Sequence, residues 1–321
     1  MNPPVALSAR GLTRSFGAVR AVDGVDLDVH ERELFGIVGP DAAGKTTLLR
    51  LLVGVLRPDA GEARILGHDI HKERQATRLL LGYMSQRFSL YEDLSVDENI
   101  AFFASLRGVS PADREARATR FLDATGLAPF RGRHAGKLSG GMKQKLGLTC
   151  TLVHEPKVLL LDEPTNGVDP VSRREFWEVL GELRTRITVI VTTPSLEEAE
   201  RCDRVALMLD GKLLTVDTTD NLRASVTAPV WEVAVEAPFL AAELLEAALP
   251  PHTVQLFGDR LHVVHEISKE ALQALLSAAG HAARIVRRTP SLEDAYVQLV
   301  TGQRSGAVAG DSPPGLGMEG V

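Results

Sequence analysis

Short apolar runs alternate with helical patterns from the N-terminus to about residue 215. Four of these runs have the length and composition of strands: Leu34–Val38, Lys157–Leu161, Thr188–Thr192 and Val205–Leu209. The segment Val158–Leu161 is apolar at every position, as in a strand that helices cover on both faces. Alternation of this kind predicts an α/β fold whose core is a mostly parallel sheet.

Between about residues 87 and 153 the hydrophobic period becomes that of helices. Stops at Gly108–Pro111 and Gly126–Pro129 divide this stretch into separate helices. The pattern predicts a helical subdomain inserted into the α/β core. Further along the chain, Asp210-Gly211 separates two apolar runs, which predicts a hairpin turn.

A third pattern begins after Pro229, where strand-like runs alternate with Ala-rich helical stretches. The strand-like runs are Val230–Val235, Thr253–Phe257 and Leu261–Val264. We therefore expect a first domain over residues 1–220 and a small α+β domain over 229–300. The stretch 301–321 is rich in Gly, Ser and Pro and lacks aromatic residues, which predicts a disordered tail.

Composition limits the classes of protein to consider. The chain has 321 residues, 44% of them hydrophobic, and a formal net charge of −6. The acidic excess gives no electrostatic reason to expect nucleic acid as a partner. No run of 18 apolar residues exists, so no membrane-spanning helix is expected. The two cysteines, Cys150 and Cys202, lie far apart in apolar stretches and are expected to be reduced core residues.

A glycine-rich stretch follows the first strand and matches the phosphate-loop pattern G-x-x-x-x-G-K-[ST]. It comprises Gly39, Pro40, Asp41, Ala42, Ala43, Gly44, Lys45, Thr46 and Thr47. Backbone N–H groups at such a strand–helix turn point at phosphates, and the helix dipole favours negative charge there. We expect Lys45 to reach the β- and γ-phosphates of a nucleotide, and the Thr46 hydroxyl to bind Mg²⁺. An ordinary turn with a solvated lysine is the alternative.

Two adjacent carboxylates, Asp162 and Glu163, directly follow a buried strand. Ligands bind at the carboxyl ends of strands in such sheets. We expect Asp162 to hold Mg²⁺ through its water shell, and Glu163 to polarise the water that attacks the γ-phosphate. The alternative is a solvated acidic turn before Pro164.

A Ser-Gly-Gly run lies within Leu138–Gln144, at the start of a helical stretch. Its free N–H groups and positive dipole end form a second anion site. One nucleotide does not need two such sites from one subunit, so this helix is expected to cap a nucleotide held by a partner. With these three motifs in order, residues 5–220 or so resemble the ATP-binding subunit of an ABC transporter.

The resemblance implies a P-loop NTPase cassette that binds ATP and Mg²⁺ and hydrolyses ATP. Phe16 resembles the aromatic residue that stacks on adenine. Gln86 resembles the glutamine that contacts the metal site and links it to the helical subdomain and the membrane partner, so it joins Glu163 as a candidate catalytic residue. The signature that contacts the γ-phosphate across a dimer interface is matched by Ser139, Gly140 and Gly141. Asp169 belongs to a stretch that resembles the loop joining the two halves.

Each of these roles has a structural alternative. Phe16 can be a core residue, Gln86 a surface polar residue, and Asp169 a turn residue before Pro170. The bulky residues of Phe88–Leu94 either fill a groove that receives a helix of the membrane protein or form the core of the helical subdomain.

One position departs from the family pattern at the γ-phosphate. The family has a histidine there, just after the strand that follows the acidic pair, whereas this chain has Pro194 and no histidine nearby. Ser195 and Glu198 are expected to form a capping box for a helix over Leu196–Cys202, so the fold is expected to survive. Loss of one preorganised contact costs about 10²–10³ in rate, which predicts a slow site.

A smaller departure lies in the phosphate loop, where Asp41-Ala42 replaces the Asn-Gly that the family usually has. Ala42 fits there only where the backbone does not demand a positive φ. Because the other phosphate-loop residues are present, we expect nucleotide binding to be intact.

The resemblance is to ABC-2-type exporters of drugs, lipids or polysaccharides, and specifically to the first cassette of tandem-cassette exporters. It implies an ABC-2-type membrane permease as partner and a place on the cytoplasmic side of the cell membrane. A heterodimer with a second ABC cassette is favoured over a homodimer, because the signature is intact while Pro194 weakens the chain's own site. A soluble ABC ATPase and a non-hydrolytic regulatory module are the alternatives. The Ser291–Asp294 capping box leads into a helix of a regulatory or dimer-forming domain.

Overall fold

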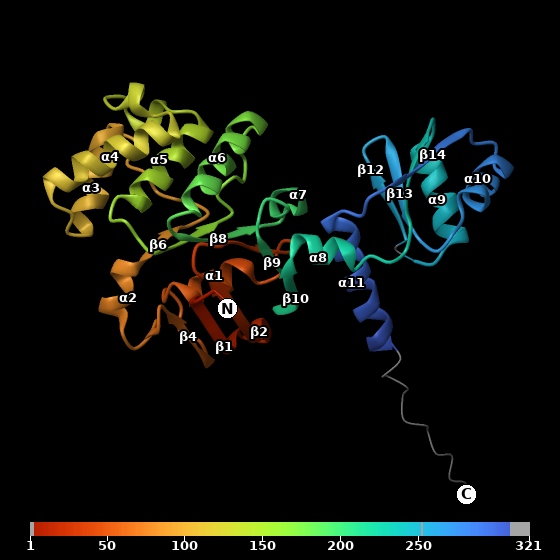
Figure 1. Ribbon diagram of the computed structural model, residues 1–321, viewed down its shortest axis with the longest axis horizontal. Helices are drawn as coiled ribbons and strands as arrows, with labels where there is room; N and C mark the ends of the chain where they lie inside the picture. The colour runs from red at the N-terminus through yellow and green to blue at the C-terminus, as the bar shows by residue number, and fades with distance from the viewer. Residues whose placement is uncertain (1–2, 252, 309–321) are drawn as a thin grey trace, which may run out of the picture. The chain divides into compact units, whose positions relative to one another are not determined.

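The computed structural model describes residues 3–251 and 253–308 (Figure 1). By its internal contacts the chain divides into two parts, Met1–Thr219 and Asp220–Val321, which are called unit 1 and unit 2 below. No helix among the described residues is both long and apolar enough to cross a bilayer.

The core of unit 1 is a six-stranded sheet in the order β10-β9-β3-β8-β7-β6. All neighbouring pairs are parallel except β9 and β10, which form the expected hairpin at Asp210-Gly211. Figure 1 draws α1 on one side of this sheet and α5 and α6 on the other, and this double cover explains why β3, β7 and β8 are buried throughout. The bounds are β3 (Leu34–Val38), β6 (Leu81–Met84), β7 (Val158–Asp162), β8 (Thr188–Thr193), β9 (Arg204–Leu209), β10 (Lys212–Thr218), α1 (Lys45–Leu52), α5 (Gly140–Leu152) and α6 (Pro170–Leu183).

A second sheet in unit 1 is antiparallel, with the order β2-β1-β4-β5. The sequence pattern did not reveal β1 and β2, because several register shifts interrupt the alternation of apolar and polar positions along them. Apolar residues of this sheet, such as Leu7 and Val29, share one core cluster with Leu48 of α1 and Ile190 of β8. The bounds are β1 (Val5–Phe16), β2 (Val19–His30), β4 (Ala60–Ile65) and β5 (His68–Asp69).

Helices occupy most of the chain between β6 and β7, and they enclose a core of their own. Ile100, Leu122 and Leu146 belong to this core, one from each of three helices. Ser95 and Ser110 cap two of the helices, each accepting a hydrogen bond from a backbone N–H of the first turn. The elements are α3 (Val96–Leu106), α4 (Pro111–Thr125), the 3₁₀ turns Ala128–Phe130 and Ala135–Lys137, and α5, while α2 (Arg74–Leu80) precedes β6.

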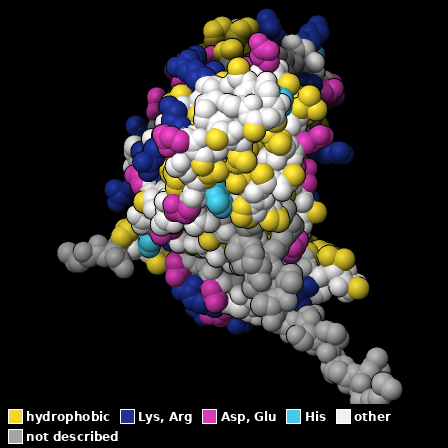
Figure 2. All heavy atoms as spheres, turned by 90° about the vertical axis from the view of Figure 1, so that its right-hand side faces the viewer, with side chains coloured by type: hydrophobic (Ala, Val, Ile, Leu, Met, Phe, Trp, Pro, Cys, Tyr) yellow, Lys and Arg dark blue, Asp and Glu magenta, His cyan; other side chains and the backbone are white. Residues whose placement is uncertain are grey.

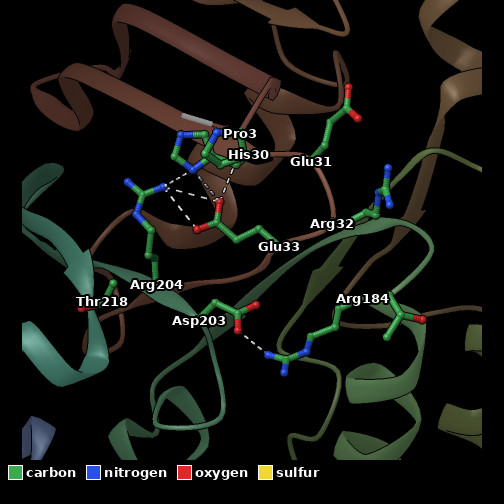
Figure 3. Close-up of a pocket in the computed structure, with 10 residues that line it drawn as sticks. Pro3, His30, Glu31, Arg32, Glu33, Arg184, Asp203, Arg204 and Thr218 are labelled. Atoms are coloured by element: carbon green, nitrogen blue, oxygen red, sulfur yellow. Dashed lines mark hydrogen bonds and ion pairs between the residues drawn. The ribbon is translucent and has the colours of Figure 1, made fainter. Parts of the chain in front are cut away.

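A charged network lies at the amino ends of β3 and β9 (Figure 3). Glu33 is only 6% exposed; it accepts the His30 backbone N–H at 2.7 Å and contacts the Arg204 guanidinium at 3.2 Å. Asp203 accepts the first N–H of β3 at 2.9 Å and pairs with Arg184. Because Glu33 and Asp203 are both partnered within the network, the network fixes the strand ends that lie opposite the carboxyl edge of the sheet.

Unit 2 is built on a four-stranded antiparallel sheet in the order β12-β13-β11-β14. Its core combines strand residues such as Val233 and Leu261 with Leu245 of α9 and Leu276 of α10. On the side shown in Figure 2, apolar side chains reach the surface among charged ones. The bounds are α8 (Thr219–Ala224), β11 (Val230–Val235), α9 (Pro238–Ala248), β12 (Val254–Phe257), β13 (Arg260–Val264), α10 (Lys269–Ala278), β14 (Ala283–Arg288) and α11 (Leu292–Val308).

The structure differs from expectation at several boundaries. Helix α7 covers Leu196–Ala199 and not the expected Leu196–Cys202, because strand β9 already begins at Arg204. Strand β14 was not expected, since three of its six residues are arginine and they do not alternate regularly with apolar residues. The capping box at Ser291 is confirmed: Asp294 and Ser291 exchange hydrogen bonds of 3.3 and 2.7 Å. The helix that it starts reaches Val308, past the expected start of the tail, and residues 309–321 lie outside the described residues.

The contact between α5 and α6 gives a test of the fold. A methyl group added at Gly141 would lie 2.3 Å from Cβ of Ser172. Gly141→Ala should therefore lower the free energy of unfolding by about 1–3 kcal/mol, measured by urea unfolding.

The matched control is Gly140→Ala, because nothing lies within 4 Å of a methyl group at that position. This variant should keep the wild-type stability. A Ser172→Gly change on top of Gly141→Ala should recover part of the loss. Equal losses in the two alanine variants would contradict the close approach of the helices.

Candidate functional site

The phosphate loop joins β3 to α1 in a conformation that its glycines permit. A methyl group at Gly39 would lie 2.1 Å from the carbonyl oxygen of Met208, so the loop passes against β9 with no room for a side chain. Gly44 precedes α1 with a φ of 103°, which side chains rarely adopt. Ala43 is buried, and its carbonyl accepts the Gly211 N–H at 3.0 Å, so the β9–β10 turn braces the loop.

Ala42 does take a positive φ, of 65°. Ala42 was expected to fit only where the backbone does not demand a positive φ, and the backbone does demand one here. An L-residue in the left-handed region costs roughly 1–2 kcal/mol, and the surrounding contacts of the loop hold the backbone there. Asp41 beside it is exposed.

Lys45 lies inside the loop and is only 4% exposed. Its ammonium group donates to the carbonyl oxygens of Gly39 and Pro40, both at 2.9 Å. It also lies 3.3 Å from Oε1 of Glu163. The loop carbonyl groups thus hold the Lys45 ammonium group, and the carboxylate of Glu163 balances its positive charge.

Asp162 ends β7 and is completely buried. Its Oδ1 accepts hydrogen bonds from the hydroxyls of Thr46 at 2.9 Å and Thr192 at 2.8 Å. Its Oδ2 is buried and has no hydrogen-bond partner among the described residues. Burial raises the pKa of the Asp162 carboxyl, the two hydroxyl bonds oppose that rise, and the charge of Glu163 adds to it.

Glu163 adopts a φ of 45°, which turns its side chain toward the phosphate loop. Its Oε2 accepts hydrogen bonds from Nε2 of Gln86 at 2.8 Å and Nδ2 of Asn166 at 3.3 Å. Gln86, which follows β6, therefore contacts the acidic pair across the sheet edge and is not merely a solvated surface residue. Lys45, Thr46, Asp162, Glu163 and Gln86 form one connected cluster.

Two members of this cluster were missed in the sequence. Thr192 is fully buried near the end of β8, where its hydroxyl donates to Asp162 and accepts the Glu163 backbone N–H at 2.9 Å. Asn166 adds the amide bond to Glu163. The signal for Thr192 was its place: it lies near the carboxyl end of the parallel strand next to the acidic pair.

The segment after β8 is fixed by Glu198 rather than by the expected capping box. Ser195 does cap α7 by accepting the Glu198 N–H at 3.2 Å. The reciprocal bond is absent, because the Glu198 carboxylate accepts from the hydroxyls of Thr165 at 2.8 Å and Thr193 at 2.6 Å instead. The Ser195 N–H donates to Thr193 at 3.0 Å. Pro194 itself is exposed.

The Ser-Gly-Gly run lies at the start of α5, as expected. Ser139 caps this helix by accepting the Met142 N–H at 3.3 Å, and a methyl group at Gly140 would meet nothing within 4 Å. Among the described residues, no hydrogen bond or ion pair joins Ser139, Gly140 or Gly141 to the Lys45–Glu163 cluster. The run is therefore available to a ligand that the chain's own phosphate loop does not hold.

Asp169 caps α6 by accepting the Ser172 N–H at 2.9 Å. This bond holds the pKa of the Asp169 carboxyl below its usual range. The contacts of Asp169 within the chain are therefore those of a turn residue before Pro170, which was the structural alternative for this position.

Phe16 ends β1 and is 48% exposed, so it is not a core residue. The Arg14 guanidinium lies 5.0 Å from the centre of its ring, at cation–π distance. Arg14 is itself held by Asp59 at 2.7 Å.

The bulky residues after Gln86 were expected either to line a groove for a helix of the membrane protein or to form the core of the helical subdomain, and their burial differs. Phe88 and Leu90 pack against the core of the helical subdomain. Tyr91 is 44% exposed and contacts Phe102 edge-on, with ring centres 4.6 Å apart.

This arrangement can bind a polyphosphate and support attack on it. The loop and the start of α1 offer backbone N–H groups and a buried cation, and Asp162 and Glu163 offer two carboxylates within reach of the same point. The fold and the site together define a P-loop nucleotide-binding domain.

Comparison with known proteins places this domain in a family. Residues 22–166 match the family described as ABC transporter. The probable multidrug ABC transporter ATP-binding protein YbhF of Escherichia coli (strain K12) is 51% identical over 217 residues, which are 67% of this chain but 37% of YbhF. The daunorubicin resistance ATP-binding protein DrrA3 of Streptomyces coeruleorubidus is 35% identical over 308 residues, 93% of this chain and 97% of DrrA3.

A solved structure agrees. The cbiO1 protein of Clostridium perfringens, part of the ABC transporter complex cbiONQ, has a TM-score of 0.64 and 26% identity, covering 69% of this chain and 91% of that one. The chain belongs to the ABC transporter family, and unit 1 contains its ATP-binding cassette. Hydrolysis of ATP is the characteristic activity of such cassettes.

The hydroxyl of Thr192 gives a test of the cluster. Thr192→Val removes the bond to Asp162 and one acceptor of the Glu163 N–H, in a place where water does not reach. It should lower the free energy of unfolding by about 1–3 kcal/mol in urea unfolding, and ATP turnover should fall with it. Thr192→Ser keeps the hydroxyl and should restore the turnover. If valine and serine variants lose the same turnover, the hydroxyl does not organise the site.

Proposed function

We propose that the chain is the ATP-binding subunit of an ABC-2-type exporter, and that it binds MgATP between its phosphate loop and the signature helix of a second cassette. One observation carries the proposal: Lys45, Thr46, Asp162, Glu163 and Gln86 converge at the carboxyl edge of the sheet through direct contacts. The names of YbhF and DrrA3 support drug export as the kind of transport.

The donor set at Asp162 fits Mg²⁺. The Oδ2 atom of Asp162 is buried and has no hydrogen-bond partner in the described part of the chain, and the Thr46 hydroxyl donates to Oδ1 of the same carboxylate. Oxygen donors of this kind are what Mg²⁺ prefers. When bound with the nucleotide, Mg²⁺ neutralises charge on the β- and γ-phosphates.

In the proposed mechanism Lys45 exchanges partners. Without nucleotide its ammonium group is balanced by Glu163; the γ-phosphate of ATP takes over that role and releases Oε1 of the glutamate. Glu163 then orients the attacking water and polarises its O–H bond, while Gln86 and Asn166 hold the other carboxylate oxygen.

The second cassette is proposed because Ser139, Gly140 and Gly141 do not contact the chain's own site. They would complete the site on the partner, and the partner's signature would complete the site built on Lys45. A heterodimer is proposed over a homodimer because Pro194 offers no imidazole to its own γ-phosphate. The chain would then carry the weaker of two sites, on the cytoplasmic side of a membrane permease.

Pro194 gives the direct test of the weak site. Pro194→His places an imidazole after β8 at an exposed position, where it has room. If the missing contact limits the rate, kcat for ATP should rise by up to roughly 10²–10³-fold in the purified chain, at a concentration where two copies supply each other's signature helix. The KM for ATP should change much less, because the phosphate loop is untouched.

Pro194→Ala is the matched control, since it removes the proline without adding an imidazole. Its kcat should stay at the wild-type level. Equal ATPase rates for the wild-type and histidine variants, with equal ATP affinity, would refute the weak-site proposal.

The proposed adenine contact of Phe16 gives a second test. Stacking on a base is worth about 1–3 kcal/mol, so Phe16→Ala should weaken ATP binding by roughly tenfold in calorimetry. Binding of inorganic tripolyphosphate, which has no base, should not change. Phe16→Tyr keeps an aromatic ring and serves as the control. An equal loss of affinity for both ligands in Phe16→Ala would contradict stacking.

A further inference from the structure

Strand β1 ends at Phe16, and a local irregularity sets the direction of this end. The antiparallel register between β1 and β2 shifts between Arg14 and Ser15. Irregularities of this kind take backbone groups out of the ladder and re-aim the side chains beside them. The Ser15 N–H donates to Oδ2 of Asp59 at 2.7 Å. The end of β1 is therefore held by a side chain from outside the strand.

The same carboxylate holds Arg14. Oδ1 of Asp59 accepts a hydrogen bond from Nη1 of Arg14 at 2.7 Å, and that nitrogen also donates to the carbonyl of Arg57 at 3.3 Å. The Asp59 backbone N–H donates to the carbonyl of Thr13 at 2.8 Å. Together with the Ser15 bond, these contacts join the end of β1 to the segment between α1 and β4.

Arg14 covers one side of the Phe16 ring. Its guanidinium carbon lies over the ring, 5.0 Å from the ring centre. Nη1 is taken by Asp59 and Arg57, whereas Nε is buried with no hydrogen-bond partner in the described part of the chain. The guanidinium group thus packs against the aromatic ring. Because Phe16 is still 48% exposed, the ring keeps surface on which another flat group can stack.

These contacts lie between the two ends of the candidate nucleotide site. Helix α1 begins at Lys45 of the phosphate loop, and the segment that holds Arg14 follows this helix. A nucleotide with its phosphates in the loop presents its base at a distance that its own covalent structure limits. An exposed aromatic ring that must first be ordered weakens binding through the conformational entropy lost. Asp59 and Arg14 order the Phe16 ring before any ligand arrives.

We propose that Arg14 is a positioning residue for the nucleobase: Asp59 holds it against one face of Phe16, and the other face of the ring stacks on adenine. The inference rests on the proposed function, which assigns adenine to Phe16. Attraction between the cation and the ring opposes rotation of the ring away from the base. Arg14 acts through Phe16 and contacts no part of the nucleotide itself.

A purely structural role makes a different prediction. If the Arg14–Asp59 pair only ties β1 to the segment after α1, its loss weakens every ligand of the phosphate loop to the same extent. The informative quantity is therefore the ratio of the affinities for ATP and for inorganic tripolyphosphate, which has no base. Calorimetry on the full chain measures both. Because both ligands bind the same folded molecules, the ratio does not depend on the fraction of protein that is folded.

The two partners of the pair are changed separately. Arg14→Gln should lower the affinity for ATP by roughly threefold to tenfold and leave the affinity for tripolyphosphate unchanged. Asp59→Asn keeps an oxygen for the Ser15 N–H but removes the charge that holds Arg14, so it should lower the same ratio. The matched control is Arg10→Gln. Arg10 is also on β1, but its partner is Asp28, so its loss should leave the ratio at the wild-type value.

A double variant tests whether Arg14 acts through the ring. When Phe16 is already alanine, Arg14 has no ring to position. Arg14→Gln combined with Phe16→Ala should therefore bind ATP no more weakly than Phe16→Ala alone.

Three results would overturn the inference. They are a wild-type ratio in Arg14→Gln or Asp59→Asn, equal losses for ATP and tripolyphosphate, and a further loss of ATP affinity when Arg14→Gln is added to Phe16→Ala. The proposed function fails on other measurements: a wild-type chain that does not bind ATP, or a Phe16→Ala variant with the wild-type affinity for ATP.

Discussion

The structure of the site depends on keeping a cation and a carboxylate pair at one sheet edge with almost no water. Lys45 and Glu163 balance each other at 3.3 Å, and Asp162 lies behind them with its Oδ1 bound by two hydroxyls. A buried charge without a partner costs several kcal/mol. The strands, the phosphate loop and the β9–β10 turn that braces it therefore act as one frame for this small set of charges.

Within this site the charges of Lys45 and Glu163 offset each other. In the proposed mechanism, a polyphosphate would bring negative charge to the phosphate loop and become a second partner of Lys45. Glu163 would then be released to orient water, still held by Gln86 and Asn166 on its other oxygen. The proposed mechanism thus links binding to activation through one lysine. Gln86 extends this set of contacts to β6, because it lies two residues beyond that strand and donates to Glu163.

The sequence predicted the α/β class, the phosphate loop and the acidic pair, because each of these is a pattern carried by residues close together in the chain. It did not predict β1 and β2, whose register shifts hide the alternation. Nor did it reveal Thr192, which matters only because parallel pairing puts it beside Asp162. Contacts of this kind depend on strand order, and no spacing within a single segment encodes them.

The contacts of Glu198 explain how the chain accommodates Pro194 after β8 without disturbing the fold. Thr165, Thr193 and Ser195 all bond within a network centred on this glutamate, and residue 194 contributes no side-chain bond to it. The segment after β8 is thus positioned by its neighbours on both sides, and the side chain between them is exposed. Such a position can gain or lose an imidazole at little cost in stability. The proposed weak site can therefore differ in its rate of hydrolysis without a change in the affinity for nucleotide.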